Sequence, residues 1–256
     1  MGLGQVFRYL FTTLLARWAG VELLGIYSIA NAVTRISEVI GKLGLDQGIL
    51  RKVSREENQE NKQTAILSAL KMGAFSGLIF MLIQIALAGY LAENIFNQSS
   101  LLTKVIAIHA LSLPFYIILH ISAFSTQAYK LLKYKIAVTE IQNPLILLLA
   151  MLVCYFFYSA ESAIIIPVVL SAVLGCITIT IFLKKVSGVN ILSVKKGEFS
   201  QDLLHYSLPI MFMSILGIVL HWTDVIMLGY FTDPTTVGLY HPAARTAGIV
   251  RIILLS

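Results

Sequence analysis

The chain has 256 residues, of which 57% are apolar and 12% are charged, and its formal net charge is +6. Soluble domains carry about 25% charged residues, so this composition excludes an ordinary soluble domain. The positive charge does not form a nucleic-acid-binding surface pattern, because lysine and arginine are confined to short gaps between apolar stretches. The composition therefore predicts an all-α polytopic membrane protein, and nucleic acid is not expected as a partner.

Seven apolar stretches follow one another along the chain, and an eighth begins near Val237. Most approach the roughly 20 residues that a helix needs to cross a bilayer. Because lipid offers the backbone no hydrogen-bond partner, each stretch is expected to be an α-helix. The seven expected spans cover residues 7–19, 23–43, 65–91, 101–124, 136–158, 163–183 and 208–231.

Lysine and arginine are concentrated in every second gap between these spans. The basic gaps follow spans two, four and six, and they contain Arg51, Lys52, Arg55 and Lys62, then Lys130, Lys133 and Lys135, then Lys184, Lys185, Lys195 and Lys196. The gaps at 94–100, 159–162 and 232–236 contain neither residue type, and the first gap has Arg17 alone. This alternation follows the positive-inside rule, so the basic gaps are expected to be cytosolic and the first span to run outward.

The longest basic gap divides the chain. Residues 1–186 are expected to form a six-helix lobe, 187–204 a cytosolic linker, and 205–256 the first two helices of a second lobe. The sequence Gly25-Ile26-Tyr27 at the start of span two is echoed by Gly238-Leu239-Tyr240 at the start of span eight, six spans later. Such a repeat predicts parallel lobes, although a match this short also arises by chance. The short first span and the apolar end predict a piece of a longer transporter-like chain.

Proline and cysteine fall inside the expected spans. Each proline can bend its helix, or it can simply reflect the frequency of proline in membrane helices. The four prolines are Pro114, Pro144, Pro167 and Pro209. Cys154 and Cys176 both lie in apolar spans, so they are expected to be buried thiols and not a disulfide.

Several ionisable side chains lie at membrane depth, where a charge costs at least about 2.5–3.5 kcal/mol unless other helices or water surround it. The basic ones include Arg8, Arg35, Arg245 and Arg251, and the acidic ones are Glu38 and Asp224. If most face one cavity, the cavity is positive and suits phosphate, which arginine binds through two hydrogen bonds. Arg35 and Glu38 share a helix face, which fits either a structural ion pair or a partly neutralised cavity arginine.

Histidines add further candidates. His221 and Asp224 share a face, so they could relay protons or bind a coupling ion, or they could only hydrogen-bond and fix helix packing. His109 and His120 lie on one side of their span and are expected to bond to neighbouring helices.

The sequence lacks the common nucleotide-binding, metal-binding and hydrolase motifs. It contains no G-x-x-x-x-G-K-[ST] loop for ATP, no H-E-x-x-H or paired C-x-x-C for a metal, and no G-x-S-x-G nucleophile elbow. We therefore expect no cofactor, no metal site, no catalytic residue and no enzymatic activity.

Four groups of segments, in order along the chain, resemble Wzx-type polysaccharide flippases. The segments are LLARWAG at 14–20 with LGIY at 24–27, LGLDQGILR at 43–51, YSLP at 206–209 with DVIMLGYF at 224–231, and VGLY at 237–240 with AAR at 243–245. Each motif is short, but their register is specific. The chain thereby resembles the multidrug/oligosaccharidyl-lipid/polysaccharide exporter superfamily.

The resemblance implies a transporter of about twelve to fourteen helices in two parallel lobes around a central cavity, here with the second lobe truncated. It implies movement of undecaprenyl-pyrophosphate-linked oligosaccharide units from the cytosolic to the periplasmic leaflet of a bacterial or archaeal plasma membrane. The implied partners are the lipid-linked oligosaccharide, membrane lipid and a polysaccharide polymerase or export machinery; the oligomeric state stays open. The candidate substrate-binding residues are Arg8, Arg17, Arg35, Arg51, Arg245 and Arg251, of which Arg17 and Arg51 match motif positions.

Two other functions stay open. A cation-coupled multidrug exporter of the same superfamily would need an acidic cavity. A membrane-embedded glycan polymerase or ligase would be expected to have a large periplasmic loop, and the outer gaps here are only a few residues long.

Overall fold

The computed structural model describes residues 2–97, 100–189, 199–240 and 242–244, and these residues form helices and no β-strand. The α-helices are α1 (Gly2–Trp18), α2 (Val21–Gly41), α3 (Leu45–Arg55), α4 (Gln59–Tyr90), α5 (Ser100–Ala110), α6 (Leu113–Ala128), α7 (Leu132–Ile136), α8 (Asn143–Phe157), α9 (Ser162–Ser187) and α10 (Gln201–Phe231). Two π-helical segments, η1 (Leu91–Ile95) and η2 (Ala137–Gln142), lie between them. The predicted all-α fold is confirmed.

Five continuous helical stretches of the described residues are long and apolar enough to cross a membrane. They are Val21–Gly41, Gln59–Ile95, Leu132–Phe157, Ser162–Ser187 and Gln201–Phe231. The bent pair α5 and α6 would make a sixth. The first expected span forms α1, which has 17 residues. Of the eighth expected span, only residues 237–240 and 242–244 are described, and Arg245 and Arg251 lie outside the described residues.

Proline shapes two of these spans. The expected single span at 101–124 is divided into α5 and α6, which meet at an angle of 40° just before Pro114. Pro144 follows η2, where the helix widens into π geometry. Proline lacks an N–H and collides with the carbonyl four residues earlier, so both distortions have the cause that the sequence indicates. Pro167 and Pro209 lie inside α9 and α10.

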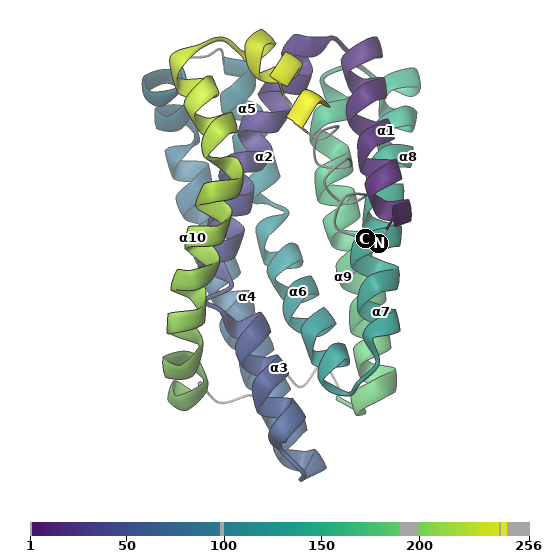
Figure 1. Ribbon diagram of the computed structural model, residues 1–256, viewed down its shortest axis with the longest axis vertical. Helices are drawn as coiled ribbons and strands as arrows, with labels where there is room; N and C mark the ends of the chain where they lie inside the picture. Colours follow the sequence, from purple (N-terminus) through teal and green to yellow (C-terminus); the bar gives the residue numbers. More distant parts are fainter. Residues whose placement is uncertain (1, 98–99, 190–198, 241, 245–256) are drawn as a thin grey trace.

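The helix ends gather at two opposite faces of the bundle (Figure 1). At one face, the Gln59 amide donates to the Tyr129 hydroxyl at 3.1 Å and to the Ser187 carbonyl at 3.0 Å, which joins the start of α4 to the ends of α6 and α9. At the other face, the Tyr155 hydroxyl donates to the Trp18 carbonyl at 3.0 Å. The described parts of the basic gaps therefore share one end, as the positive-inside pattern predicts.

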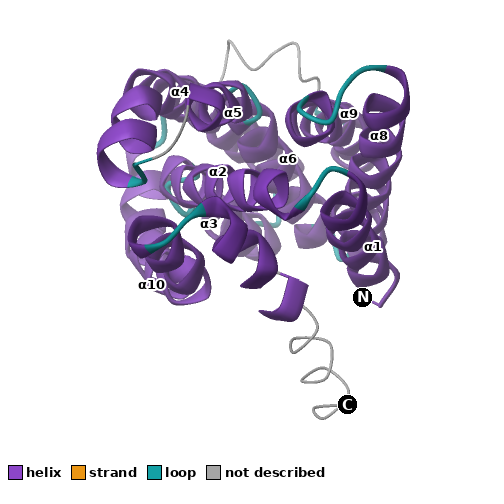
Figure 2. Cartoon of the chain, turned by 90° about the horizontal axis from the view of Figure 1, so that it is seen from above, coloured by secondary structure: helices purple, strands orange, loops and turns teal. Residues whose placement is uncertain are grey.

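Viewed along the bundle, α2 and α6 occupy the middle (Figure 2). Helix α10 packs on α2 and α3, while α1 packs on α8. Large apolar side chains on the outer faces, including Phe75, Leu82 and Phe157, are exposed and fit contact with lipid. Cys154 and Cys176 are free and buried, as expected.

The echoed motifs meet at the face opposite the basic gaps. A methyl group added at Gly25 would overlap the carbonyl oxygen of Pro234, and one added at Gly238 would overlap that of Val21. Pro234, whose carbonyl faces Gly25, lies four residues before Gly238. Val21, whose carbonyl faces Gly238, lies four residues before Gly25. The contact is therefore reciprocal, as two equivalent helix starts related by a two-fold axis would make it.

Candidate functional site

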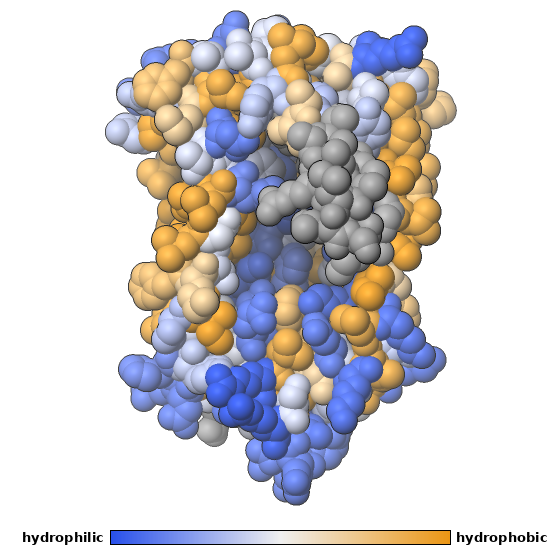
Figure 3. Space-filling model, viewed as in Figure 1, coloured by the Kyte–Doolittle hydropathy of each residue, from blue (hydrophilic) through white to orange (hydrophobic). Residues whose placement is uncertain are grey.

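A cavity of about 860 Å³ lies between α1, α2, α6, η2, α8, α9 and α10. Figure 3 shows a hydrophilic hollow on this side of the molecule, flanked by apolar surface. Its volume is near the upper end of the roughly 300–1,000 Å³ range of small-molecule sites. Its walls combine charged, amide and aromatic side chains: Gln5, Arg8, Tyr9, Tyr27, Asn31, Arg35, Tyr116, His120, Thr139, Glu140, Asn143, Ser171, His221, Trp222, Asp224 and Tyr240.

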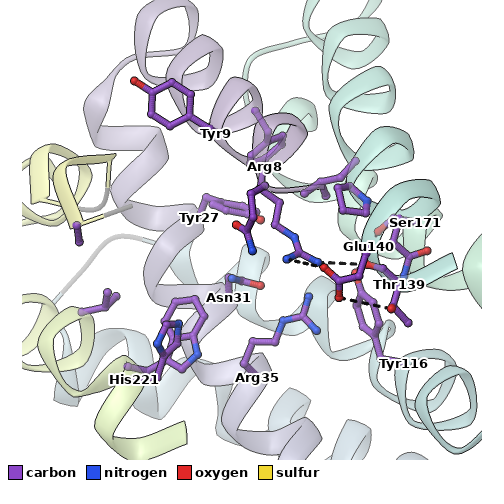
Figure 4. Close-up of a pocket in the computed structure, with 18 of the residues that line it drawn as sticks. Arg8, Tyr9, Tyr27, Asn31, Arg35, Tyr116, Thr139, Glu140, Ser171 and His221 are labelled. Atoms are coloured by element: carbon purple, nitrogen blue, oxygen red, sulfur yellow. Dashed lines mark hydrogen bonds and ion pairs between the residues drawn. The ribbon is translucent and has the colours of Figure 1, made fainter. Parts of the chain in front are cut away.

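Arg8 reaches the cavity from α1. Its Nη1 lies 3.6 Å from Glu140 Oε2, and its Nη2 donates to the Thr139 carbonyl at 3.2 Å (Figure 4). Both partners belong to η2, the segment widened before Pro144. Gly4 allows α1 to sit directly on this segment, because a methyl group there would overlap the Glu140 carbonyl oxygen. A guanidinium has five N–H donors, so Arg8 keeps some for a ligand.

Arg35 approaches the same space from α2 (Figure 4). Its Nη1 lies 2.6 Å from Glu38 Oε2, and its guanidinium carbon lies 4.5 Å from the centre of the Tyr116 ring. The side chain is 31% exposed, whereas that of Glu38 is 3% exposed. Arg35 is therefore both a member of an ion pair and a cavity arginine. The two interpretations of the Arg35–Glu38 pair, a structural ion pair and a partly neutralised cavity arginine, are both correct.

Glu38 is the centre of a buried charge network. Lys42 Nζ and His120 Nε2 each lie 3.3 Å from Glu38 Oε1. Lys42 Nζ also lies 3.5 Å from Asp46 Oδ2, at the start of α3. The expected interhelical role of histidine is confirmed: His120 joins α6 to α2, and His109 Nε2 lies 2.9 Å from the Ile164 carbonyl oxygen of α9.

The α10 wall carries the predicted His221 and Asp224, and both line the cavity. Asp224 Oδ2 accepts a hydrogen bond from the Tyr240 hydroxyl at 2.6 Å. The His221 ring instead lies edge-on to Trp222, with centroids 5.5 Å apart. The two residues share the wall, but the described hydrogen bonds of the carboxylate come from the Tyr240 hydroxyl and from the Val225 N–H, which donates to Oδ1 at 2.9 Å.

The other predicted arginines lie elsewhere. Arg17 is in the last turn of α1, outside the cavity wall. Arg51, on α3 at the basic end, bonds to the Tyr206 hydroxyl and lies over its ring at 4.9 Å. Arg245 and Arg251 are outside the described residues. The structure therefore brings together Arg8 and Arg35 from the predicted set.

The sequence reasoning missed Glu140, Thr139, Tyr116 and Asn143. Thr139, Glu140, Gln142 and Asn143 form a polar run inside an expected span, directly before Pro144, which was an available signal. Asn143 Oδ1 is buried and has no hydrogen-bond partner among the described residues. Glu140 and Asp224 balance Arg8 and Arg35 in the described wall, so it lacks the positive excess that a count of membrane residues suggested.

Among the described residues, no group of three or more His, Cys, Asp or Glu side chains could hold a metal ion.

Comparison with known proteins gives one match. The sequence profile of the family described as "Polysaccharide biosynthesis protein" matches residues 1–256. No curated protein and no solved structure matches the chain.

Proposed function

The chain belongs to the polysaccharide biosynthesis protein family, and on this premise we propose that it is a flippase for lipid-linked oligosaccharides. Its substrate is an oligosaccharide unit carried on undecaprenyl pyrophosphate, moved from the cytosolic to the periplasmic leaflet of a bacterial or archaeal plasma membrane. Residues 1–186 form one lobe in this proposal, 187–204 the linker and 205–256 the start of the second lobe.

The observation that carries the proposal is the pairing of two cavity arginines with an amide-rich and aromatic wall. Arg8 and Arg35 lie on α1 and α2 and both retain donors for the oxygens of a diphosphate. Asn31 and Asn143 offer amide groups to sugar hydroxyls, and Tyr27 and Trp222 offer aromatic faces. The apolar outer faces leave the polyprenyl tail in lipid.

A second candidate, a cation-coupled drug exporter, draws support from Glu140 and Asp224 in the wall. Both carboxylates already have partners, Arg8 and Tyr240 respectively. A lipophilic cation would have to compete with these contacts, so we place this function second.

The test is transport in proteoliposomes that contain the full chain. A fluorescent oligosaccharide on undecaprenyl pyrophosphate is placed in one leaflet, and its arrival in the other is followed by quenching. Loss of a charged hydrogen-bond donor costs about 1.5–3 kcal/mol, so Arg8→Gln and Arg35→Gln should each reduce transport at limiting substrate about tenfold or more.

Arg17→Gln is the matched control, because Arg17 lies outside the cavity wall on the same helix as Arg8. It should transport at the wild-type rate. Equal rates for all three variants would refute the proposal, and so would transport of tetraphenylphosphonium with no transport of the glycolipid.

A further inference from the structure

His120 and Arg35 are the two members of the Glu38 network that also line the cavity. The Glu38 side chain behind them is 3% exposed, while those of His120 and Arg35 are 25% and 31% exposed. A ligand in the cavity therefore reaches Glu38 only through these two neighbours, which makes the network responsive to what the cavity holds.

The charges around His120 balance when its ring is neutral. In α2, α3 and the turn between them, the cations Arg35 and Lys42 face the carboxylates Glu38 and Asp46. The other charged groups near this part of α6 or across the cavity are Lys135 of α7, Arg8 of α1, Glu140 of η2 and Asp224 of α10. The neutral titratable groups that line the same cavity are His221 and the phenols of Tyr9, Tyr27, Tyr116 and Tyr240. Lys135 lies over Phe124 of α6, with its ammonium 3.4 Å from the ring centre, and it bonds to Gln127 at 2.8 Å.

A neutral His120 ring carries its hydrogen on either Nε2 or Nδ1. Nε2 lies 3.3 Å from Glu38 Oε1, and an ionised carboxylate only accepts hydrogen bonds, so the tautomer with the hydrogen on Nε2 suits this contact. The lone pair is then on Nδ1. A proton from cavity water would bind at Nδ1, and the resulting imidazolium would still donate from Nε2 to Glu38.

A phosphate at Arg35 disturbs this balance. It draws the guanidinium away from Glu38 and adds negative charge beside a carboxylate that is almost fully buried. A buried charge that loses its partner is costly, and a new cation beside it restores the balance. Lys42 is already paired with Glu38 and Asp46, so His120 is the neighbouring group that can gain a charge.

We propose that His120 is a proton-binding site coupled to the cavity, which takes up a proton when a diphosphate binds at Arg35. This coupling rests on the proposed function and deepens it. By linkage, a ligand whose binding takes up a proton binds more tightly as the pH falls, and the ligand in turn strengthens proton binding. The effect is expected at the pH values where the bound anion, by adding negative charge near the ring, favours the protonated form of His120.

The test uses the purified full chain and the symmetrical dimethyl diester of diphosphate. This soluble probe copies the substrate's central group and stays fully ionised above pH 5, so any proton taken up belongs to the protein. Calorimetry in two buffers of different ionisation enthalpy counts the protons. In the wild type, uptake should approach one proton, and affinity should rise up to about tenfold per pH unit as the pH falls.

The variants His120→Gln and His221→Gln form a matched pair, since both histidines line the cavity. His120→Gln should bind the probe with an affinity that does not change between pH 5.5 and 8, whereas His221→Gln should keep the wild-type dependence. The proton count in the wild type needs no variant, so it decides the matter even if His120→Gln does not fold.

The outcomes separate this inference from the proposed function. Binding of the probe without proton uptake, or uptake that persists in His120→Gln, overturns the coupling and leaves the flippase proposal intact. No binding of the probe at any pH overturns both. Uptake that disappears in His221→Gln instead would assign the proton to α10 and also overturn the inference.

Discussion

At the scale of single residues, Glu38 joins the buried ion pairs of α2 to two side chains of the cavity wall. It pairs with Arg35, Lys42 and His120 and is almost fully buried. The spacing of Arg35 and Glu38 predicts their pairing from sequence. The approach of His120 comes from a different helix, and no spacing along one helix could reveal it.

Removing the Glu38 charge should destabilise the protein strongly. Loss of one partner from a buried ion pair costs about 3–5 kcal/mol, and the partly wet surroundings of Arg35 favour the lower end of this range. Glu38→Gln should therefore unfold at a clearly lower temperature in detergent than the wild type.

Glu140→Gln is the comparison for this prediction, because the Arg8–Glu140 pair is longer and both side chains are about a third exposed. Its cost should stay within about 1 kcal/mol. A Glu38→Gln protein as stable as Glu140→Gln would contradict the structural role of the network.

At the scale of elements, proline and glycine set the positions of the site residues. The sequence marks Pro144, but it does not show that η2 widens and turns Glu140 toward Arg8. That outcome depends on Gly4 of α1, more than 130 residues away, against which the widened segment packs. Local bends were predictable here, and their tertiary partners were not.

The contact between the helix starts at Gly25 and Gly238 should tolerate no side chain larger than that of glycine. A methyl group at Gly25 would overlap backbone, which cannot move aside as a flexible side chain can. Gly25→Ala should lower the unfolding temperature, or open the contact so that a fluorophore pair across residues 22 and 236 reports a longer distance.

Gly217→Ala is the control for this crossing. Gly217 lies inside α10 with nothing within 4 Å of an added methyl group, so alanine should be neutral or stabilise the helix by about 0.5–1 kcal/mol. Equal behaviour of Gly25→Ala and Gly217→Ala would show that the helix starts do not touch in the protein.

Asp233 precedes the helical segment 234–240 and lies in the expected outer gap 232–236, before the eighth expected span begins near Val237. Hydrogen bonds from Thr236 hold the pKa of its carboxyl below the usual value, and the Thr236 N–H donates to Oδ1 at 2.7 Å. A depressed pKa means that the stabilisation is complete above the usual value, about 3.9, and is lost as the pH falls through the lower value in the folded protein. The stability difference between wild type and Asp233→Ala should therefore be constant near neutral pH and shrink in strong acid.

At the scale of the whole molecule, hydropathy and the placement of lysine and arginine were sufficient to predict the fold class and the two ends of the bundle. They were not sufficient to predict which arginines share a cavity. Arg17 and Arg51 match motif positions, yet they lie near opposite ends of the bundle and outside the cavity wall. Each span can be predicted from a continuous stretch of sequence, whereas the cavity is formed by helices that are distant from one another in the sequence.

The topology makes a direct prediction for cysteine labelling in intact cells. Single cysteines at Lys62 and Lys133 should react only after a membrane-permeable reagent is added, and one at Ser162 should react with an impermeant reagent. Cys154 and Cys176 are buried, so they give a low background. Reaction of all three positions from the same side would contradict the positive-inside assignment.

The central claim is that a lipid-linked oligosaccharide occupies the cavity, and photo-crosslinking tests it most directly. Leu147 lines the cavity on α8, and Leu149, two residues later, is 51% exposed on the outer face of the same helix. With benzoylphenylalanine at Leu147, illumination should attach the undecaprenyl-pyrophosphate glycolipid, and the dimethyl diester of diphosphate should suppress the reaction. At Leu149 the product should be bulk lipid, unaffected by the diester. Equal glycolipid capture at both positions, or capture at Leu147 that the diester does not reduce, would contradict the account.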